Sequence, residues 1–252
     1  KAYIHQYKLG KKEMDWLDYK TALTNAIQPT RDAQSTEVLF IEQCHNFLSE
    51  QGYLAIVIPD GILTNSSLQY VRDNIEEMYR IVAVVSMPQT AFTSTGAGVK
   101  SSVLFLRKHK NKQSDKISHQ KEKLKEQLKK ETKFIETVEK WEKEKKEAIT
   151  RLEKQAQKQN PTLRKNDITK IIQADKTAIQ NAFTDKVNLL KEELTEKYFI
   201  AKQTTLDDYP IFMAIAEDIG YDATGRNTGN NELTEIGKEL SKFIVHINKT
   251  EK

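Results

Sequence analysis

The stretch G-Y-L-A-I-V-I-P-D-G at residues 52–61 decides the fold class of this chain. Five consecutive apolar residues in it lead directly into Pro59, Asp60 and Gly61. A short apolar run closed by turn residues is typical of a strand that is buried on both faces of a parallel sheet. Open α/β sheets bind their ligands just outside the carboxyl ends of such strands. We therefore expect Asp60 and Gly61 to border a functional site.

The flanking residues repeat the alternation of helix and strand. Apolar residues recur at helical spacing over 36–48 and 67–78, and apolar runs predict strands at Tyr53–Pro59, Ile81–Met87 and Ser101–Leu106. The last strand follows its neighbour through a loop without a helix, so it should run antiparallel. This order predicts an α/β fold that corresponds to the C-terminal half of a Rossmann-like, doubly wound sheet.

Residues 109–202 have a different composition. Lys, Glu and Gln dominate, and Asn160-Pro161 separates two heptad-like series of apolar residues. We interpret them as a long antiparallel helical hairpin, similar to a coiled coil, inserted between residues 1–108 and 203–252. The last segment should contain a short apolar helix at Tyr209–Ile219 and an amphipathic helix at Leu233–Ile247 that packs back on the sheet domain. The two series are Leu124, Leu128, Ile135, Val138, Ile149, Leu152 and Ala156, and then Ile168, Ile172, Ile179, Phe183, Val187, Leu190 and Leu194.

Charge and cysteine content limit the class of protein. The net charge is +4, yet residues 107–197 alone carry 25 Lys and Arg against 16 Asp and Glu, which favours an anionic partner for a basic appendage. The single cysteine, Cys44, excludes an intrachain disulfide and is typical of a cytoplasmic protein. No apolar run is long enough to span a membrane, and the five histidines show no metal-ligand spacing.

Several of these stretches together resemble the modification (M) subunit of type I restriction–modification systems, an adenine-specific DNA methyltransferase. The resemblance covers residues 1–108 and 203–236 and skips the hairpin. The matching stretches are S-T-E-V-L-F-I-E-Q-C at 35–44, G-Y-L-A-I-V-I-P-D-G-I-L at 52–63, Y-V-R at 70–72, I-V-A-V-V-S-M-P at 81–88, G-V-K-S-S-V-L-F-L-R-K at 98–108, Y-P-I-F-M-A-I-A-E at 209–217 and G-Y-D-A-T-G-R at 220–226.

This resemblance implies transfer of a methyl group from S-adenosyl-L-methionine to the exocyclic amino group of an adenine flipped out of duplex DNA. The family's catalytic tetrad, Asn/Asp-Pro-Pro-Phe/Tyr, and its glycine-rich cofactor loop are both missing from this sequence: Asn160-Pro161 lacks the second proline, and Gly96 and Gly98 precede a strand instead of following one. By the family's order we expect both motifs to lie upstream of Lys1. The resemblance thus implies a C-terminal portion of a class I methyltransferase, inactive by itself, whose partners are DNA and a specificity subunit, and whose cofactor is bound mainly by the missing N-terminal half.

The resemblance also suggests site residues. Phe92, in the loop after the second predicted strand, matches the aromatic residue that stacks on the flipped adenine, although it could equally close the edge of the core. Pro59, Asp60 and Gly61 match the wall of the adenine pocket, where Asp-Gly is also a common turn. Thr64, Asn65, Lys100, Ser101 and Ser102 are candidates for contacts to the DNA backbone, against the alternatives of a helix-capping loop and an ordinary strand start. We assign no catalytic residue and no metal ligand.

Besides an unrelated doubly wound protein in which the motif matches are coincidental, two interpretations of the whole chain remain open from the sequence. The first is a part of an adenine methyltransferase that supplies sheet strands and the adenine-side wall. The second is an inert remnant that acts as an interaction or DNA-binding module through its hairpin, which would contact a partner subunit, serve as a spacer or bind DNA directly. Deleting residues 112–198 distinguishes them, because only the first predicts that the sheet domain still functions.

Overall fold

The computed structural model describes residues 3–12, 15–18 and 29–251 of the chain. Its contacts divide it into two units. The sheet unit contains the described residues of 3–12, 29–119 and 208–251, and the hairpin unit contains those of 15–18 and 120–207. Within the described part, no helix combines the length and the apolar character needed to cross a bilayer.

The sheet unit is built from alternating helices and strands, as the sequence predicts for residues 36–108. A mixed α/β architecture is therefore confirmed. Its elements, in chain order, are α1 (Thr36–Phe47), β1 (Tyr53–Pro59), α2 (Asp60–Thr64), α3 (Gln69–Met78), β2 (Tyr79–Ser86), β3 (Ser101–Lys108), β4 (Phe212–Ile215), β5 (Ile219–Tyr221), β6 (Asn227–Asn231) and α8 (Leu233–Thr250).

Four strands form the main sheet in the order β1-β3-β2-β4. β3 runs antiparallel to both of its neighbours, β1 and β2. This confirms the prediction made from the loop without a helix that precedes β3. β1 and β2 therefore point in the same direction, on either side of β3. The register pairs Pro59 with Ser101, and Ser86 with Ser102, so the carboxyl ends of β1 and β2 meet the amino end of β3 at one edge of the sheet.

The prediction that strand 53–59 is buried on both faces is wrong. β1 is an edge strand of the described sheet and pairs only with the antiparallel β3. Ile58 is fully buried, but Val57 is 50% exposed and Tyr53 is 39% exposed. An apolar run predicts a strand, but it does not show which other elements of the chain cover that strand. An exposed face therefore cannot be recognised from the run alone.

The helix expected at residues 209–219 is also absent. The segment instead contributes β4, which pairs in parallel with β2 in a register that joins Ala83 to Phe212 and Ser86 to Ile215. A short apolar run satisfies helix and strand patterns equally, and here the open edge of β2 supplies hydrogen-bond partners that favour the strand. The pairing leaves Met213 and Ile215 largely exposed on the outer strand.

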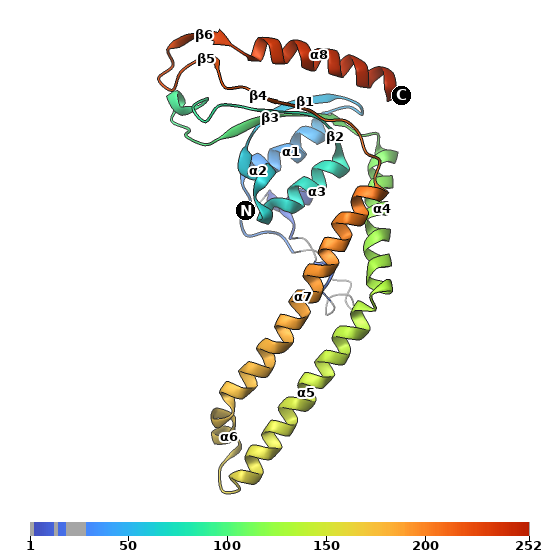
Figure 1. Ribbon diagram of the computed structural model, residues 1–252, viewed down its shortest axis with the longest axis vertical. Helices are drawn as coiled ribbons and strands as arrows, with labels where there is room; N and C mark the ends of the chain where they lie inside the picture. The colour runs from blue at the N-terminus through green and yellow to red at the C-terminus, as the bar shows by residue number, and fades with distance from the viewer. Residues whose placement is uncertain (1–2, 13–14, 19–28, 252) are drawn as a thin grey trace. The chain divides into compact units, whose positions relative to one another are not determined.

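Helices cover both faces of this sheet. α1 and α3 lie on one face and α8 lies on the other (Figure 1). The first layer buries Val38 and Ile41 of α1 and Val71 and Ile75 of α3 against the sheet. In the second layer, Leu240 and Ile247 of α8 pack on Val82 and Ala83, with Phe105, Phe212, Phe243 and Ile244 around them.

The end of α8 is joined to the sheet by a charged cluster, named here the Glu251 cluster: Arg80, Arg107, Asn248 and Glu251. The Glu251 carboxylate accepts hydrogen bonds from Arg80 Nη2 at 2.6 Å and from Arg107 Nη2 at 2.7 Å. Arg107 Nη1 also donates to Asn248 Oδ1, and Arg80 Nη2 donates to the carbonyl of Pro210, just before β4. Because both arginine side chains are almost fully buried, this carboxylate is their essential counter-charge.

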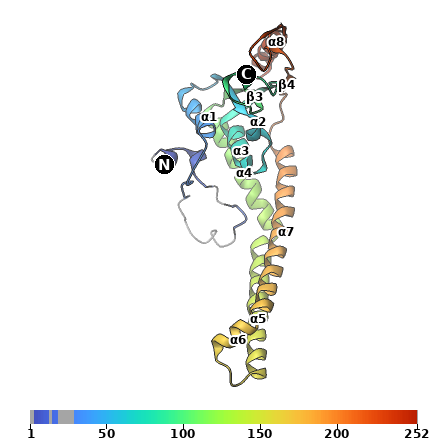
Figure 2. The ribbon, with the colours of Figure 1, turned by 90° about the vertical axis from the view of Figure 1, so that its left-hand side faces the viewer.

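The hairpin unit consists of long helices, and an antiparallel helical hairpin is confirmed. α4 (Asn111–Glu131) leads into α5 (Phe134–Gln159), and α7 (Gln173–Thr205) returns beside α5, with the short α6 (Lys165–Ile171) between them (Figures 1 and 2). Asn160-Pro161 lies at the reversal, as predicted. Lys133, between α4 and α5, has a φ of +47°, which breaks the heptad phase. Phe134 is therefore buried in the apolar cluster, whereas the predicted Ile135 is exposed.

Candidate functional site

The carboxyl edge of the main sheet brings together several of the site residues predicted from the sequence. Asp60 follows β1 directly, and its Oδ1 accepts a hydrogen bond of 2.7 Å from the hydroxyl of Ser102 in β3. Its backbone N–H donates to the carbonyl of Lys100 at 2.9 Å. These two bonds hold Asp60 against the start of β3. Neither of them involves the second carboxylate oxygen, Oδ2.

The neighbouring residues of β3 are tied to the end of β2. Met87 donates its backbone N–H to the carbonyl of Ser101, and its own carbonyl accepts a hydrogen bond from the ammonium of Lys100. The hydroxyls of Ser101 and Ser102 both donate to protein acceptors, and both residues are buried. The two serines therefore join strand ends in this structure, whereas Lys100 is a partly exposed positive charge at this edge.

Thr64 and Asn65 lie one helical turn beyond Asp60. The Thr64 hydroxyl donates to the carbonyl of Asp60 at 3.0 Å, and Asn65 Oδ1 accepts from the backbone N–H of Ser67, capping the turn that leads into α3. Arg72, a residue without a predicted role, donates to the carbonyls of Ile62 and Asn65 at 2.9 and 2.8 Å. This arginine fixes the α2–α3 connection beside the edge.

Phe92 lies in the loop that follows β2, where the sequence predicts it. Its half-buried ring packs against an apolar cluster that contains Met87, Ala91 and Val103. The loop closes on itself, because Gln89 Nε2 donates to the carbonyl of Gly98 at 2.9 Å. The ring is consequently held in place and keeps part of its surface open to solvent.

The β5–β6 hairpin is attached to the same loop. Tyr221 donates its hydroxyl to the carbonyl of Ala91 at 3.1 Å. The turn of this hairpin is ordered by Asp222, whose Oδ1 accepts from the hydroxyl of Thr224 and from the backbone N–H of Arg226. These bonds, above all that from Thr224, lower the pKa of the Asp222 carboxyl. Arg226 is exposed on this turn.

The glycines at this edge do not form a cradle for the methionine part of S-adenosyl-L-methionine. A side chain added at Gly61, Gly96 or Gly98 would meet no atom within 4 Å, so none of them marks a close backbone approach. Gly96 is needed for its φ of +87° in the loop before β3. The residues described here do not fit the cofactor, and they also contain no cluster of three or more His, Cys, Asp or Glu side chains that could hold a metal ion.

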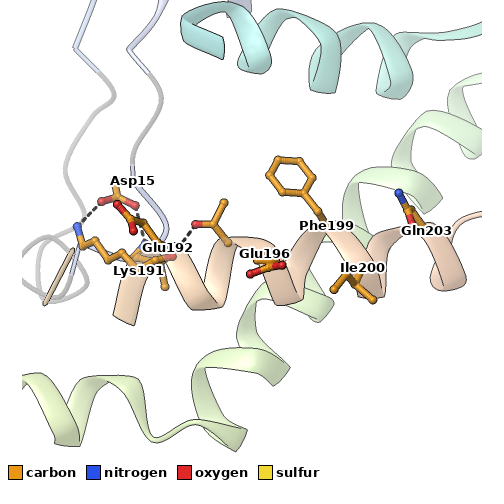
Figure 3. A pocket seen from close by; sticks show the side chains of 9 residues that line it. Asp15, Lys191, Glu192, Glu196, Phe199, Ile200 and Gln203 are labelled. Carbon is orange, nitrogen blue, oxygen red and sulfur yellow. Dashed lines mark hydrogen bonds and ion pairs between the residues drawn. The ribbon is translucent and has the colours of Figure 1, made fainter. Parts of the chain in front are cut away.

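A hollow of about 570 Å³ lies elsewhere, in the hairpin unit. It is bordered by one side of α7 and by Asp15 and Leu17, and Asp15 forms an ion pair of 2.5 Å with Lys191 (Figure 3). None of the predicted site residues lines it, so we do not place the chemistry there. Its remaining lining residues are Glu192, Thr195, Glu196, Phe199, Ile200 and Gln203.

Sequence reasoning missed the charged residues that join distant segments of the sheet unit away from this edge, among them Arg80 and Arg107 at the opposite end of β2 and β3. Arg80, Arg107 and Glu251 are up to 171 positions apart, and no local pattern connects them. Glu42 is similar: it is buried and accepts the backbone N–H groups of Lys8 and Leu9 at 2.8 Å each. Charged residues inside apolar patterns were the available signal, since buried charges are normally paired.

Comparisons with known proteins indicate the family of this chain. A solved structure described as a class I S-adenosylmethionine-dependent methyltransferase from Listeria monocytogenes is similar to this chain at 25% identity, over 39% of this chain and 29% of that chain, with a TM-score of 0.27. No curated protein matches the chain. The profile of the N-6 DNA methylase family matches residues 10–205, which is most of the sequence, and the chain therefore belongs to the N-6 DNA methylase family.

Proposed function

We propose that this chain is the C-terminal portion of a site-specific adenine DNA methyltransferase of a restriction–modification system, and that it corresponds to part of a type I modification subunit. In this proposal it contributes the adenine-side wall of the active site. The reaction is methylation of the exocyclic amino group of adenine, with S-adenosyl-L-methionine bound mainly by a second polypeptide segment. The specificity subunit and DNA would be its cytoplasmic partners.

One observation carries this proposal. In a chain of the N-6 DNA methylase family, the carboxyl ends of β1 and β2 open onto the same sheet edge, and the Phe92 loop follows directly from that edge. Ligands of open α/β sheets bind at this kind of edge. A base flipped from the duplex needs an aromatic or apolar surface on which to stack, and the partly open ring of Phe92 offers one.

Each side chain has a distinct part in this proposal. Phe92 stacks on the flipped adenine, and the turn formed by Pro59, Asp60 and Gly61 borders the base. Lys100 and the α2 end with Thr64 and Asn65 contact the DNA backbone. The hydroxyls of Ser101 and Ser102 act from inside the protein, because the bond from Ser102 orients the carboxylate of Asp60.

The free edge of β1 supports the idea that further strands complete the sheet. β1 has seven residues, contains no charged side chain and pairs on one side only within the described sheet. Natural edge strands are usually protected by charges, prolines within the strand or bulges, and β1 has only Pro59 at its end. A polypeptide that carries the glycine-rich cofactor loop and the catalytic tetrad would pair with the free side of β1.

Reconstitution tests the proposal. The chain is mixed with a polypeptide that carries the cofactor loop and tetrad of the same enzyme family, and transfer of a labelled methyl group to duplex DNA is measured. We expect activity only in the mixture, and we expect it to persist when residues 112–198 are deleted. If an intact parent enzyme is active but no mixture methylates DNA, the assignment of this chain as a functional part is wrong.

Two substitutions of Phe92 separate stacking from packing. Phe92→Leu keeps the apolar contacts of the loop and removes the aromatic face, whereas Phe92→Trp keeps both. Stacking contributes about 1–3 kcal/mol per base, so we expect Phe92→Leu to lower kcat/KM roughly 5- to 150-fold and Phe92→Trp to remain close to the unchanged protein. Equal activities of the three proteins would remove Phe92 from the site.

A further inference from the structure

The positive charge of the hairpin unit is concentrated where α5 turns back toward α7. We name residues 151–172 the hairpin tip; they include the end of α5, the reversal and α6 (Figure 2). The tip contains six Lys and Arg against two Asp and Glu, whereas 120–150 and 173–207 together contain fifteen against fourteen. Balanced charge is usual for a solvated helix, and the tip departs from that balance.

Ion pairs with residues outside the tip leave the imbalance unchanged, because one basic and one acidic tip residue each form such a pair. Arg151 is paired at 3.4 Å with Glu147, which precedes the tip. Glu153, one of the two acidic residues of the tip, is paired at 3.3 Å with Lys176, which lies outside the tip. Asp167 is then the one tip carboxylate outside an ion pair in the described structure. Four exposed tip cations have no carboxylate within ion-pair distance among the described residues: Lys154, Lys158, Arg164 and Lys170.

Three of the six tip cations, including the paired Arg151, lie along α5. Arg151, Lys154 and Lys158 recur at spacings of three and four residues, which places them on one face of α5. The opposite face carries Leu152 and Ala156, which pack with isoleucines of the α6 region. The rise of 1.5 Å per residue spreads the three cations over about 10 Å.

We propose that the hairpin tip binds the phosphate backbone of duplex DNA without reading its sequence. A row of exposed cations on a rigid helix face is suited to phosphates, and the exposed amides of Gln155, Gln157 and Gln159 add hydrogen-bond donors beside it. The proposal depends on the proposed function only in taking DNA as the substrate. It assigns to this part of the chain a DNA contact distinct from the carboxyl edge of the sheet.

Salt-dependent binding tests this assignment on the full chain. The affinity for a duplex of unrelated sequence is measured between 50 and 200 mM salt, a range in which phosphate contacts dominate the change. The tip variant replaces Lys154, Lys158, Arg164 and Lys170 by Gln. We expect weaker binding and a log–log salt slope flattened by up to about 3.6, because each lost phosphate contact removes about 0.9.

A matched control carries the same change of charge on the hairpin arms. It replaces Lys140, Lys143, Lys146 and Lys186, all exposed, by Gln. We expect its slope to stay close to that of the unchanged chain. Equal effects of the two variants on DNA binding, or no effect of the tip variant, would overturn the proposal. A tip variant that loses binding to anionic lipid vesicles but keeps its binding to DNA would also overturn it.

Two further measurements make the result independent of folding and of methyl transfer. Duplex DNA should protect Lys154, Lys158 and Lys170 of the unchanged chain from amine acetylation and leave Lys140 reactive; the absence of this protection would refute the tip contact. Phe92→Leu should leave the salt slope unchanged. If the tip binds DNA but the reconstituted mixture does not methylate it, the proposed function is wrong and the tip assignment stands. If the mixture methylates DNA but the tip does not bind it, the tip assignment is wrong and the proposed function stands.

Discussion

The Glu251 cluster allows a sharp test of how the C-terminal helix is held on the sheet. Replacing Glu251 by Gln removes the counter-charge of Arg80 and Arg107, whose side chains are only 3% and 10% exposed. Breaking a buried ion pair by removing one partner costs about 3–5 kcal/mol. Glu251 itself is 29% exposed, and Gln keeps one acceptor, so we expect a loss of about 2–3 kcal/mol.

Hydrogen exchange is the appropriate assay, because it reports on the sheet unit separately. Arg80 also holds Pro210, so amides of β4 and of the end of α8 should exchange about 30- to 150-fold faster in Glu251→Gln. Both tryptophans, Trp16 and Trp141, belong to the hairpin unit, and their unfolding transition should not move.

The matched control is Glu235→Gln, at an exposed ion pair of 3.1 Å with Lys238 on the same helix. Exposed pairs contribute at most about 1 kcal/mol, so exchange in β4 should change little. If the two substitutions speed exchange in β4 to a similar extent, burial of the arginines does not determine how much stability is lost.

Acid should remove the same stabilisation. Burial alone would raise the pKa of the Glu251 carboxyl, but the hydrogen bonds and charges of Arg80 and Arg107 outweigh it and hold this pKa below its ordinary value of 4.5. A lowered folded-state pKa stabilises the protein above the unfolded pKa, and this contribution is lost as the pH falls through the folded one. The difference in exchange between the unchanged chain and Glu251→Gln should therefore narrow below about pH 4.5.

Three further predictions concern the hairpin, the sheet edge and the loop before β3. Phe134→Ala should lower the free energy of unfolding of the hairpin unit by about 3–5 kcal/mol, and Ile135→Ala should lower it by less than about 1 kcal/mol, as measured by tryptophan fluorescence in urea. The opposite order would mean that Ile135 is the buried residue, as the heptad pattern predicts. Ser102→Ala removes the hydrogen bond to Asp60 and should cost about 1 kcal/mol in exchange of β1 and β3 amides; no change would mean that the bond contributes nothing. Gly96→Ala forces a side chain onto a φ of +87° and should destabilise its loop by about 1 kcal/mol, seen as faster proteolysis there and nowhere else.

The sequence predicted those features that are local in the chain. The helix and strand order of 36–108 followed from apolar periodicity, and the antiparallel direction of β3 followed from a loop too short for a crossover. The positions of Asp60, Lys100 and Phe92 near strand ends were predicted in the same way. What these side chains bind stays a prediction.

The predictions failed where a non-local neighbour decides the outcome. The run at 209–219 satisfies both helix and strand patterns, and the open edge of β2, more than a hundred residues earlier, selects the strand. Phe134 and Ile135 are adjacent candidates for one seam, and the left-handed Lys133 decides between them.

By itself the amino-acid sequence determined the α/β class and the inserted hairpin, because periodicity, turn residues and charge are local quantities. Only the tertiary structure decided that β1 lies at an edge, that β4 joins the sheet, and that Glu251 neutralises two buried arginines from β2 and β3. Burial and charge pairing depend on which distant segments meet, and that is set by the free energy of the whole packed unit.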